Sequence, residues 1–248
     1  GMNDRNQTFT PQQIAERRIG DPRWIYVPVR WHKSSDGKWW WKGDTSSDEF
    51  NGHLMGAYYF HKLVADEGMK KRVEQHVDNI LMHVINHNYT MTDPSTGKPT
   101  RWGVWTPEKL SNDPDWWVEA PINTFELLTF LRLGHYMTGK EIYNTEFERL
   151  VQQYDFVNRH MSRPRAPRLA ERSRIDDGML TEMGQLLMDT EPNPEYKKIY
   201  REGLTWSYRM VENDQNPWFN FGFGMLGGKN FHLEESVEFL RDHPLDMR

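Results

Sequence analysis

The sequence predicts an all-α fold in which antiparallel helical hairpins form a partial (α/α) toroid, with long Trp-rich loops on one face. Three observations predict it. Apolar residues recur at helical spacing in paired segments, a short turn joins the two members of each pair, and strand patterns are almost absent. Long loops alternate with the short turns, and in an α/α barrel this asymmetry separates a closed face from a working face.

The helices follow one another as three hairpins with shorter helices around them. The first hairpin turns at "DEG", the first helix of the second hairpin closes at Gly139, and the third hairpin turns at "TEPNPE". The predicted helices cover, in order, about 11–19, 47–66, 69–88, 119–137, 140–160, 176–189, 194–213, a helix beginning within 216–228, and 233–244. Only about seven of them are long, which is too few for the twelve of a complete toroid.

Two segments do not read as long helices. Residues 89–118 are rich in Gly, Pro, Asp and Trp, and "DPSTGK" at 93–98 predicts the tip of a small β-hairpin. The first 40 residues carry one short helix and an extended stretch, "RWIYVPVRW". We therefore expect an irregular N-terminal extension over 1–40 and a single helical-hairpin domain over 41–248.

Composition narrows the possible partners. The net charge is -5 and the chain has no Lys/Arg block that would follow a phosphate backbone, so we expect no nucleic-acid partner. The most basic run, 159–174, contains prolines and predicts a connecting loop, with a docking patch for an anion as the alternative. The chain has no cysteine, which excludes disulfides, thiolate metal sites and a Cys nucleophile.

The compartment stays open. The apolar runs are much shorter than the roughly 20 residues that cross a membrane, so we expect no membrane span. Gly1 ahead of Met2 resembles the remnant of a cleaved tag, so a leader segment could have preceded this chain. If such a signal peptide existed, we expect a periplasmic or secreted protein.

Three carboxylates gather where the first long helix begins. Ser46 and Glu49 match a capping box, which accounts for Glu49 without any chemistry. Carboxylates in a first helical turn stay ionised, so Asp48 and Glu49 would serve as bases or as oxygen ligands for Ca²⁺. Asp44 lies ahead of the helix beside tryptophans, where a raised pKa would suit a proton donor.

A second acidic pair, Asp176 and Asp177, opens the third hairpin. Helix capping is again the structural interpretation. Because the two clusters begin two hairpins, they predict carboxylates that face each other across one mouth. The candidate catalytic residues are therefore Asp44, Asp48, Glu49 and Asp177.

Tryptophan is the unusual feature of the composition. The chain has 11 Trp, and many lie in polar, turn-rich stretches instead of on apolar helix faces. Indole rings beside carboxylates suit sugars, because the rings stack on C–H faces while the acids bind hydroxyls; anchoring of the long loops is the alternative. His53, one turn after Glu49, and the cation Arg101 are further candidates. The candidate substrate-binding residues are Trp41, His53, Arg101, Trp102, Trp105, Trp117 and Asp176.

Several segments resemble a known group of proteins. The segments "GDTSSDEFNGH" (43–53), "GKPTRWGVWTPEKLSN" (97–112) and "NPWFNFGFGMLGG" (216–228), followed by "LEESVEFLRDHPLD", look like a bacterial family without an assigned activity, itself similar to six-hairpin (α/α)-toroid glycosidase-like proteins. The resemblance spans about 40–245 and implies a toroid first and carbohydrate chemistry second. Relatives often carry an acid after the Asp pair, where this chain has Gly178.

Three functions stay open. The first is a glycoside hydrolase with Asp44 as proton donor and Asp48, Glu49 or Asp177 as base; carboxyls roughly 6.5–9.5 Å apart would predict inversion and about 5.5 Å retention. The second is a non-catalytic glycan-binding or scaffold protein whose acids cap helices or bind Ca²⁺. The third is a polysaccharide lyase with Arg101 as clamp. We expect an oligo- or polysaccharide partner, no metal or other cofactor apart from a possible Ca²⁺, and a possible homo-oligomer.

Overall fold

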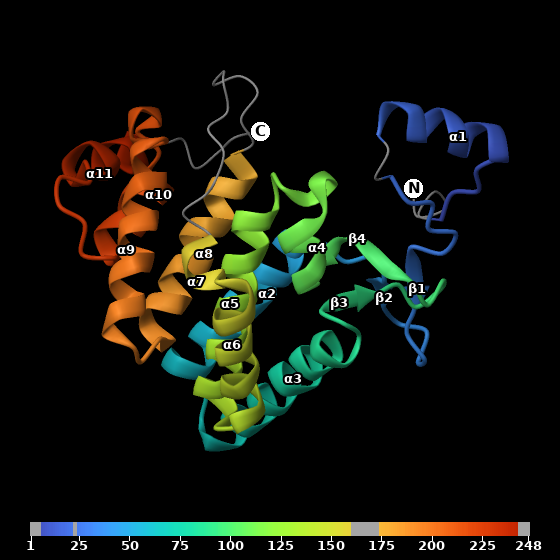
Figure 1. Ribbon diagram of the computed structural model, residues 1–248, viewed down its shortest axis with the longest axis horizontal. Helices are drawn as coiled ribbons and strands as arrows, with labels where there is room; N and C mark the ends of the chain where they lie inside the picture. Colours follow the sequence, from blue (N-terminus) through green and yellow to red (C-terminus); the bar gives the residue numbers. More distant parts are fainter. Residues whose placement is uncertain (1–5, 22–23, 160–173, 243–248) are drawn as a thin grey trace.

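The computed structural model describes residues 6–21, 24–159 and 174–242, and within them the chain is mostly helical (Figure 1). The α-helices are α1 (Pro11–Gly20), α2 (Ser47–Leu63), α3 (Glu67–Asn86), α4 (Pro107–Asn112), α5 (Ala120–Thr138), α6 (Glu141–Tyr154), α7 (Phe156–Arg159), α8 (Arg174–Thr190), α9 (Pro194–Arg209), α10 (Pro217–Met225) and α11 (Leu233–Asp242). Two small antiparallel sheets pair β1 (Trp31–Lys33) with β2 (Trp40–Lys42) and β3 (Thr90–Thr92) with β4 (Pro99–Val104). Most of the basic run expected as a loop, 160–173, lies outside the described residues.

The three predicted helical hairpins are present as α2/α3, α5/α6 and α8/α9. Local capping sets their ends. The side chain of Asp66 accepts a hydrogen bond from the backbone N–H of Met69 where α3 begins, and Gly139 ends α5 with φ of +67°, a left-handed conformation that glycine adopts without strain. The segment "DPSTGK" forms the tip of the β3/β4 hairpin, as predicted.

Helix α5 is the centre of the molecule. Every residue from Ala120 to Gly134 is buried, and the helix packs against α3, α6, α7 and α8. Gly134 permits the closest approach, because an added Cβ would lie 2.9 Å from side-chain atoms of Leu81 on α3 and Tyr143 on α6. A polar side chain on α5 is consequently surrounded by protein on all sides.

The N-terminal part forms one side of the molecule in Figure 1, with α1, the β1/β2 hairpin and the β3/β4 hairpin together and α9 to α11 on the opposite side. The β1/β2 hairpin lies against the β3/β4 turn, since an added Cβ at Gly43 would lie within 2.8 Å of both His32 and Pro94. The sequence did not predict β1 and β2, and a boundary at residue 40 would divide their hairpin.

Candidate functional site

The beginnings of α2 and α8 lie side by side, with α5 beneath them. The Ser47 hydroxyl of α2 donates a weak hydrogen bond to the Met179 sulfur of α8 at 3.9 Å, and both helices pack on α5. The first turns of the first and third hairpins therefore meet, and each carries acidic residues into the same region.

Glu126 of α5 lies at the bottom of this region. Its side chain is fully buried, and its carboxyl accepts hydrogen bonds at 2.6 Å from the Asn51 amide of α2 and at 2.6 Å from the Trp105 indole N–H. The pKa of Glu126 is raised to about 7, mainly by burial and to a lesser extent by the negative charges of Asp176 and Asp48, against the opposing effect of these two hydrogen bonds. Glu126 therefore holds its proton up to near-neutral pH.

Glu182 of α8 is the second carboxyl with an unusual environment. It is half-buried, and its pKa is raised first by burial and then by the negative charge of Asp48. Asp48 itself is exposed at the start of α2, where its carboxylate accepts a hydrogen bond from the Ser46 hydroxyl. The charges of Asp48 and Asp176 thus act on groups of two other helices.

We call Asp48, Glu126, Asp176 and Glu182 the acidic cluster. A negative charge near a carboxyl raises the pKa of that carboxyl, and the raised pKa values of Glu126 and Glu182 arise in part in this way. A protonated carboxyl next to an ionised one is the arrangement that general acid–base chemistry requires.

Sequence reasoning missed Glu126, Glu182 and Asn51. Glu126 stands between Phe125 and Leu127 in an otherwise apolar stretch, and a carboxyl on a helix with no polar face is the signal that could have identified it. Glu182 carries no such signal, because an acid in the middle of an amphipathic helix is common.

Glu49 serves the helix start, as the capping box predicts. Its carboxylate accepts a hydrogen bond from the Ser46 backbone N–H at 3.1 Å and lies 2.6 Å from the Lys42 ammonium. Burial opposes ionisation of Glu49, but these partners outweigh it and hold its pKa below the usual value. This favours the ionised form and ties β2 to the first turn of α2.

Asp44, the predicted proton donor, forms an ion pair with Arg30 at 2.9 Å. This contact engages the Asp44 carboxylate with a charged partner from the same chain. We therefore assign that role to the acidic cluster instead of to Asp44.

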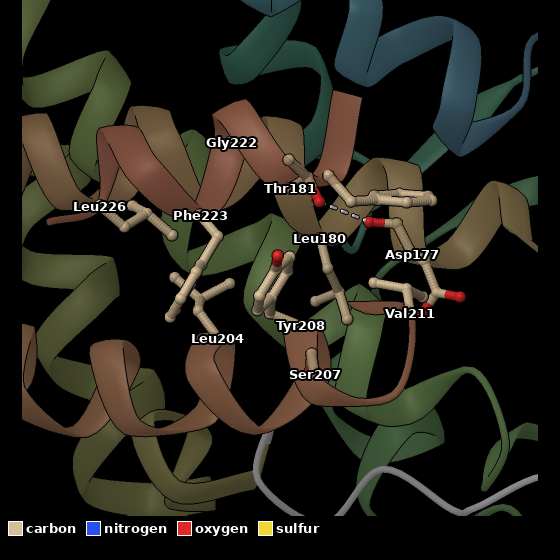
Figure 2. Close-up of a pocket in the computed structure, with 11 residues that line it drawn as sticks. Asp177, Leu180, Thr181, Leu204, Ser207, Tyr208, Val211, Gly222, Phe223 and Leu226 are labelled. Carbon is tan, nitrogen blue, oxygen red and sulfur yellow. Dashed lines mark hydrogen bonds between the residues drawn. The ribbon is translucent and has the colours of Figure 1, made fainter. Parts of the chain in front are cut away.

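Asp177, the neighbour of Asp176 in the chain, lines a small cavity. The residue is buried, and the cavity of about 20 Å³ lies between α8, α9 and α10, with its other walls mostly apolar (Figure 2). Its backbone carbonyl accepts a hydrogen bond from the Thr181 hydroxyl at 2.9 Å, as Figure 2 shows. A cavity of this size holds about one water molecule, so it offers no room for a saccharide. Of the predicted pair, Asp176 is the residue whose charge acts on Glu126.

The predicted aromatic residues are divided among different places. Trp105 is fully buried and positions Glu126, so it cannot stack on a ligand. Trp41 is 47 % exposed on the β1/β2 hairpin and stacks on His32, with ring centroids 4.5 Å apart, while Trp117 is 61 % exposed ahead of α5.

The two remaining predicted contacts lie elsewhere. Arg101 forms an ion pair with Asp21 and lies over the Trp102 ring at 4.3 Å, so the N-terminal segment occupies it. His53 points from α2 to α3, where its Nε2 lies 2.7 Å from Nε2 of His76. Neither belongs to the acidic cluster.

The described residues contain no group of three or more His, Asp or Glu side chains that could hold a metal ion. Nor does this part of the chain include a helix long and apolar enough to cross a membrane. Comparison of the chain with protein-family models, with curated proteins and with solved structures finds no match.

Proposed function

We propose that the chain is a carbohydrate-active protein of the glycoside hydrolase type, built as a partial (α/α) toroid. In this proposal Glu182 donates a proton to the leaving oxygen, Asp48 is the ionised carboxylate partner, and Glu126 with Asp176 sets the charge of the site. The observation that carries it is the half-buried Glu182, whose pKa is raised by burial and by the negative charge of Asp48.

Positions around the cluster support these roles. Asp48 and Glu182 are both accessible at least in part, whereas Glu126 is fully buried and cannot touch a substrate without rearrangement. The helix start favours a negative charge on Asp48, and the Ser46 hydroxyl holds its carboxylate in place. Glu126 is therefore a positioning residue in this proposal.

Exposed indoles support a saccharide as the substrate class. Trp39, Trp40 and Trp41 are 42–71 % exposed on and beside β2, and the bond between Lys42 and Glu49 ties β2 to the first turn of α2, next to Asp48. Flat apolar rings beside carboxylates provide both of the contacts that a sugar ring makes.

A non-catalytic glycan-binding protein is the second candidate. The observation that favours it is that both oxygens of Glu126 already have hydrogen-bond donors, Asn51 and Trp105, as in a purely structural polar network. In that case the exposed tryptophans would carry the affinity. The lyase alternative needs Arg101 as a clamp, and that cation is paired with Asp21.

Hydrolysis of a panel of aryl α- and β-glycosides of hexoses and pentoses, with matched carboxamide variants, tests the proposal. We expect Glu182→Gln and Asp48→Asn each to lower kcat by about 100-fold or more, because each removes one partner of proton transfer. Glu49→Gln is the control, since it removes a carboxylate from the same helical turn, and we expect it to retain activity within about threefold. Turnover that survives both cluster variants would contradict the assignment. If the wild type and all variants bind glycans but none hydrolyses them, the result would favour the non-catalytic glycan-binding protein.

A further inference from the structure

An open groove of about 790 Å³ runs between α2 and α3. Its walls are mostly apolar or small, and several of them are exposed. The lining residues are Gly52, His53, Gly56, Ala57 and Phe60 from α2, and Met69, Arg72, Val73 and His76 from α3. An added Cβ at Gly52 or Gly56 would meet nothing within 4 Å, so the backbone of α2 leaves space for another element to approach.

The groove carries one permanent positive charge. No carboxylate lines it, and its one permanently charged side chain is Arg72. Among the described residues, none of the ion pairs involves Arg72. His53 of α2 and His76 of α3 line the groove from its two sides, with their Nε2 atoms 2.7 Å apart. A well-matched occupant therefore combines an apolar face with negative charge.

Helix α11 has both properties. Leu233, Val237 and Leu240 form a stripe at helical spacing and are 50, 40 and 51 % exposed. The helix is nevertheless fixed in place, because the buried Ser236 hydroxyl accepts a hydrogen bond from the Asn220 amide of α10 at 2.8 Å. Its apolar stripe thus faces outward from a rigid anchor.

The charge of α11 complements the groove. Its ten residues contain four acids, Glu234, Glu235, Glu238 and Asp242, against the single cation Arg241. In Figure 1, α11 lies at the edge of the molecule far from α3, so a chain cannot place α11 in its own groove. The helix and the groove can meet only between two molecules.

We infer that α11 of a second copy of this chain docks into the α2/α3 groove. The Leu233, Val237 and Leu240 stripe lies on the small residues of α2, and the acids beside it face Arg72. Each molecule offers one helix and one groove, so a two-fold symmetric dimer makes the contact twice.

Mass measurement by light scattering on the full chain is the first test. We expect a species of twice the chain mass at micromolar concentration. Val237→Glu places a charge within the stripe and should raise the dimer dissociation constant by about tenfold or more. Ile19→Glu, at an 84 % exposed position of α1, is the matched control and should leave the dimer unchanged. A monomer at all concentrations, or a dimer insensitive to Val237→Glu, would overturn the inference.

Cross-linking tests the pairing directly, since the chain has no cysteine of its own. A mixture of Gly56→Cys and Val237→Cys chains, treated with a short bis-maleimide, should give a covalent dimer. Mixing Ile19→Cys with Gly56→Cys should give none. Efficient cross-linking of Val237→Cys alone would instead show that α11 pairs with α11 and would refute the groove as its partner.

Discussion

At position 126 a carboxyl group lies in the fully buried part of α5, where burial raises its pKa to about 7. The Asn51 amide and the Trp105 indole satisfy both oxygens, and the charges of Asp176 and Asp48 favour retention of the proton. The protonation of this one α5 side chain thus depends on residues of α2 and α8. The environment of this single residue therefore defines the candidate site.

Glu126 predicts a pH-dependent stability. Its folded pKa lies above the ordinary 4.5, so the folded protein binds more protons than the unfolded chain between about pH 4.5 and 7, and this group makes stability fall as the pH rises through that window. Glu126→Gln removes the titration. We expect the free energy of unfolding of the wild type, relative to the variant, to decrease by about 3 kcal/mol between pH 4 and pH 8.

Urea unfolding at both pH values measures this difference. Glu49→Gln is the control with the opposite sign. The pKa of Glu49 is lowered, so its contribution is present above about pH 4.5 and is lost as the pH falls further. If the free energies of unfolding of wild type and Glu126→Gln differ by the same amount at pH 4 and at pH 8, Glu126 titrates normally.

At the scale of elements, two helical glycines predict opposite effects of alanine. Gly134→Ala on α5 would place a Cβ 2.9 Å from Leu81 and Tyr143, and we expect a loss of about 1–3 kcal/mol of stability. Gly178→Ala on α8 meets nothing within 4 Å and should stabilise by about 0.5–1 kcal/mol through helix propensity. Chemical denaturation of both variants measures the effects, and equal effects would contradict the packing of α5.

The elements were also the part most readily predicted from the sequence. Periodic apolar residues located the three helical hairpins, and local signals such as Asp66 and Gly139 located their ends, because capping depends on neighbouring residues alone. The pairing of β1 with β2 was missed. Its strands have three residues each, and their aromatic and charged residues give no alternation.

The candidate site was predicted only in part, for a physical reason. The two acidic clusters, Asp44, Asp48 and Glu49 on one side and Asp176 and Asp177 on the other, were expected to face each other because both begin hairpins. Of these residues, Asp48 and Asp176 have charges that act on the common carboxyl of Glu126. Glu126 and Glu182 enter the cluster through the packing of α5 and α8, which no local pattern encodes. The ion pair that occupies Asp44 comes from Arg30, fourteen residues earlier in an irregular segment.

At the scale of the whole molecule, one buried ion pair joins distant parts of the chain. Arg132 of α5 is 3 % exposed and donates from Nε to the fully buried Glu191 carboxylate at 2.9 Å, just after α8. We expect Glu191→Ala to cost about 3–5 kcal/mol, because it leaves the guanidinium without its main buried partner.

Thermal or chemical denaturation of Glu191→Ala checks this. Glu67→Ala is the matched control, since it breaks the exposed pair with Lys70 on α3 and should cost less than about 1 kcal/mol. Similar losses of stability in the two variants would mean that the buried Arg132–Glu191 pair contributes no more than an exposed pair.

The central claim is that carboxyls from α2, α5 and α8 form one electrostatically coupled cluster, and carboxyl ¹³C NMR titration of Glu126 and Glu182 tests it most directly. We predict raised pKa values for both, near 7 for Glu126, and a decrease of both in Asp48→Asn but not in Asp44→Asn. Ordinary pKa values near 4.5 in the wild type, or values that do not respond to Asp48→Asn, would contradict the account.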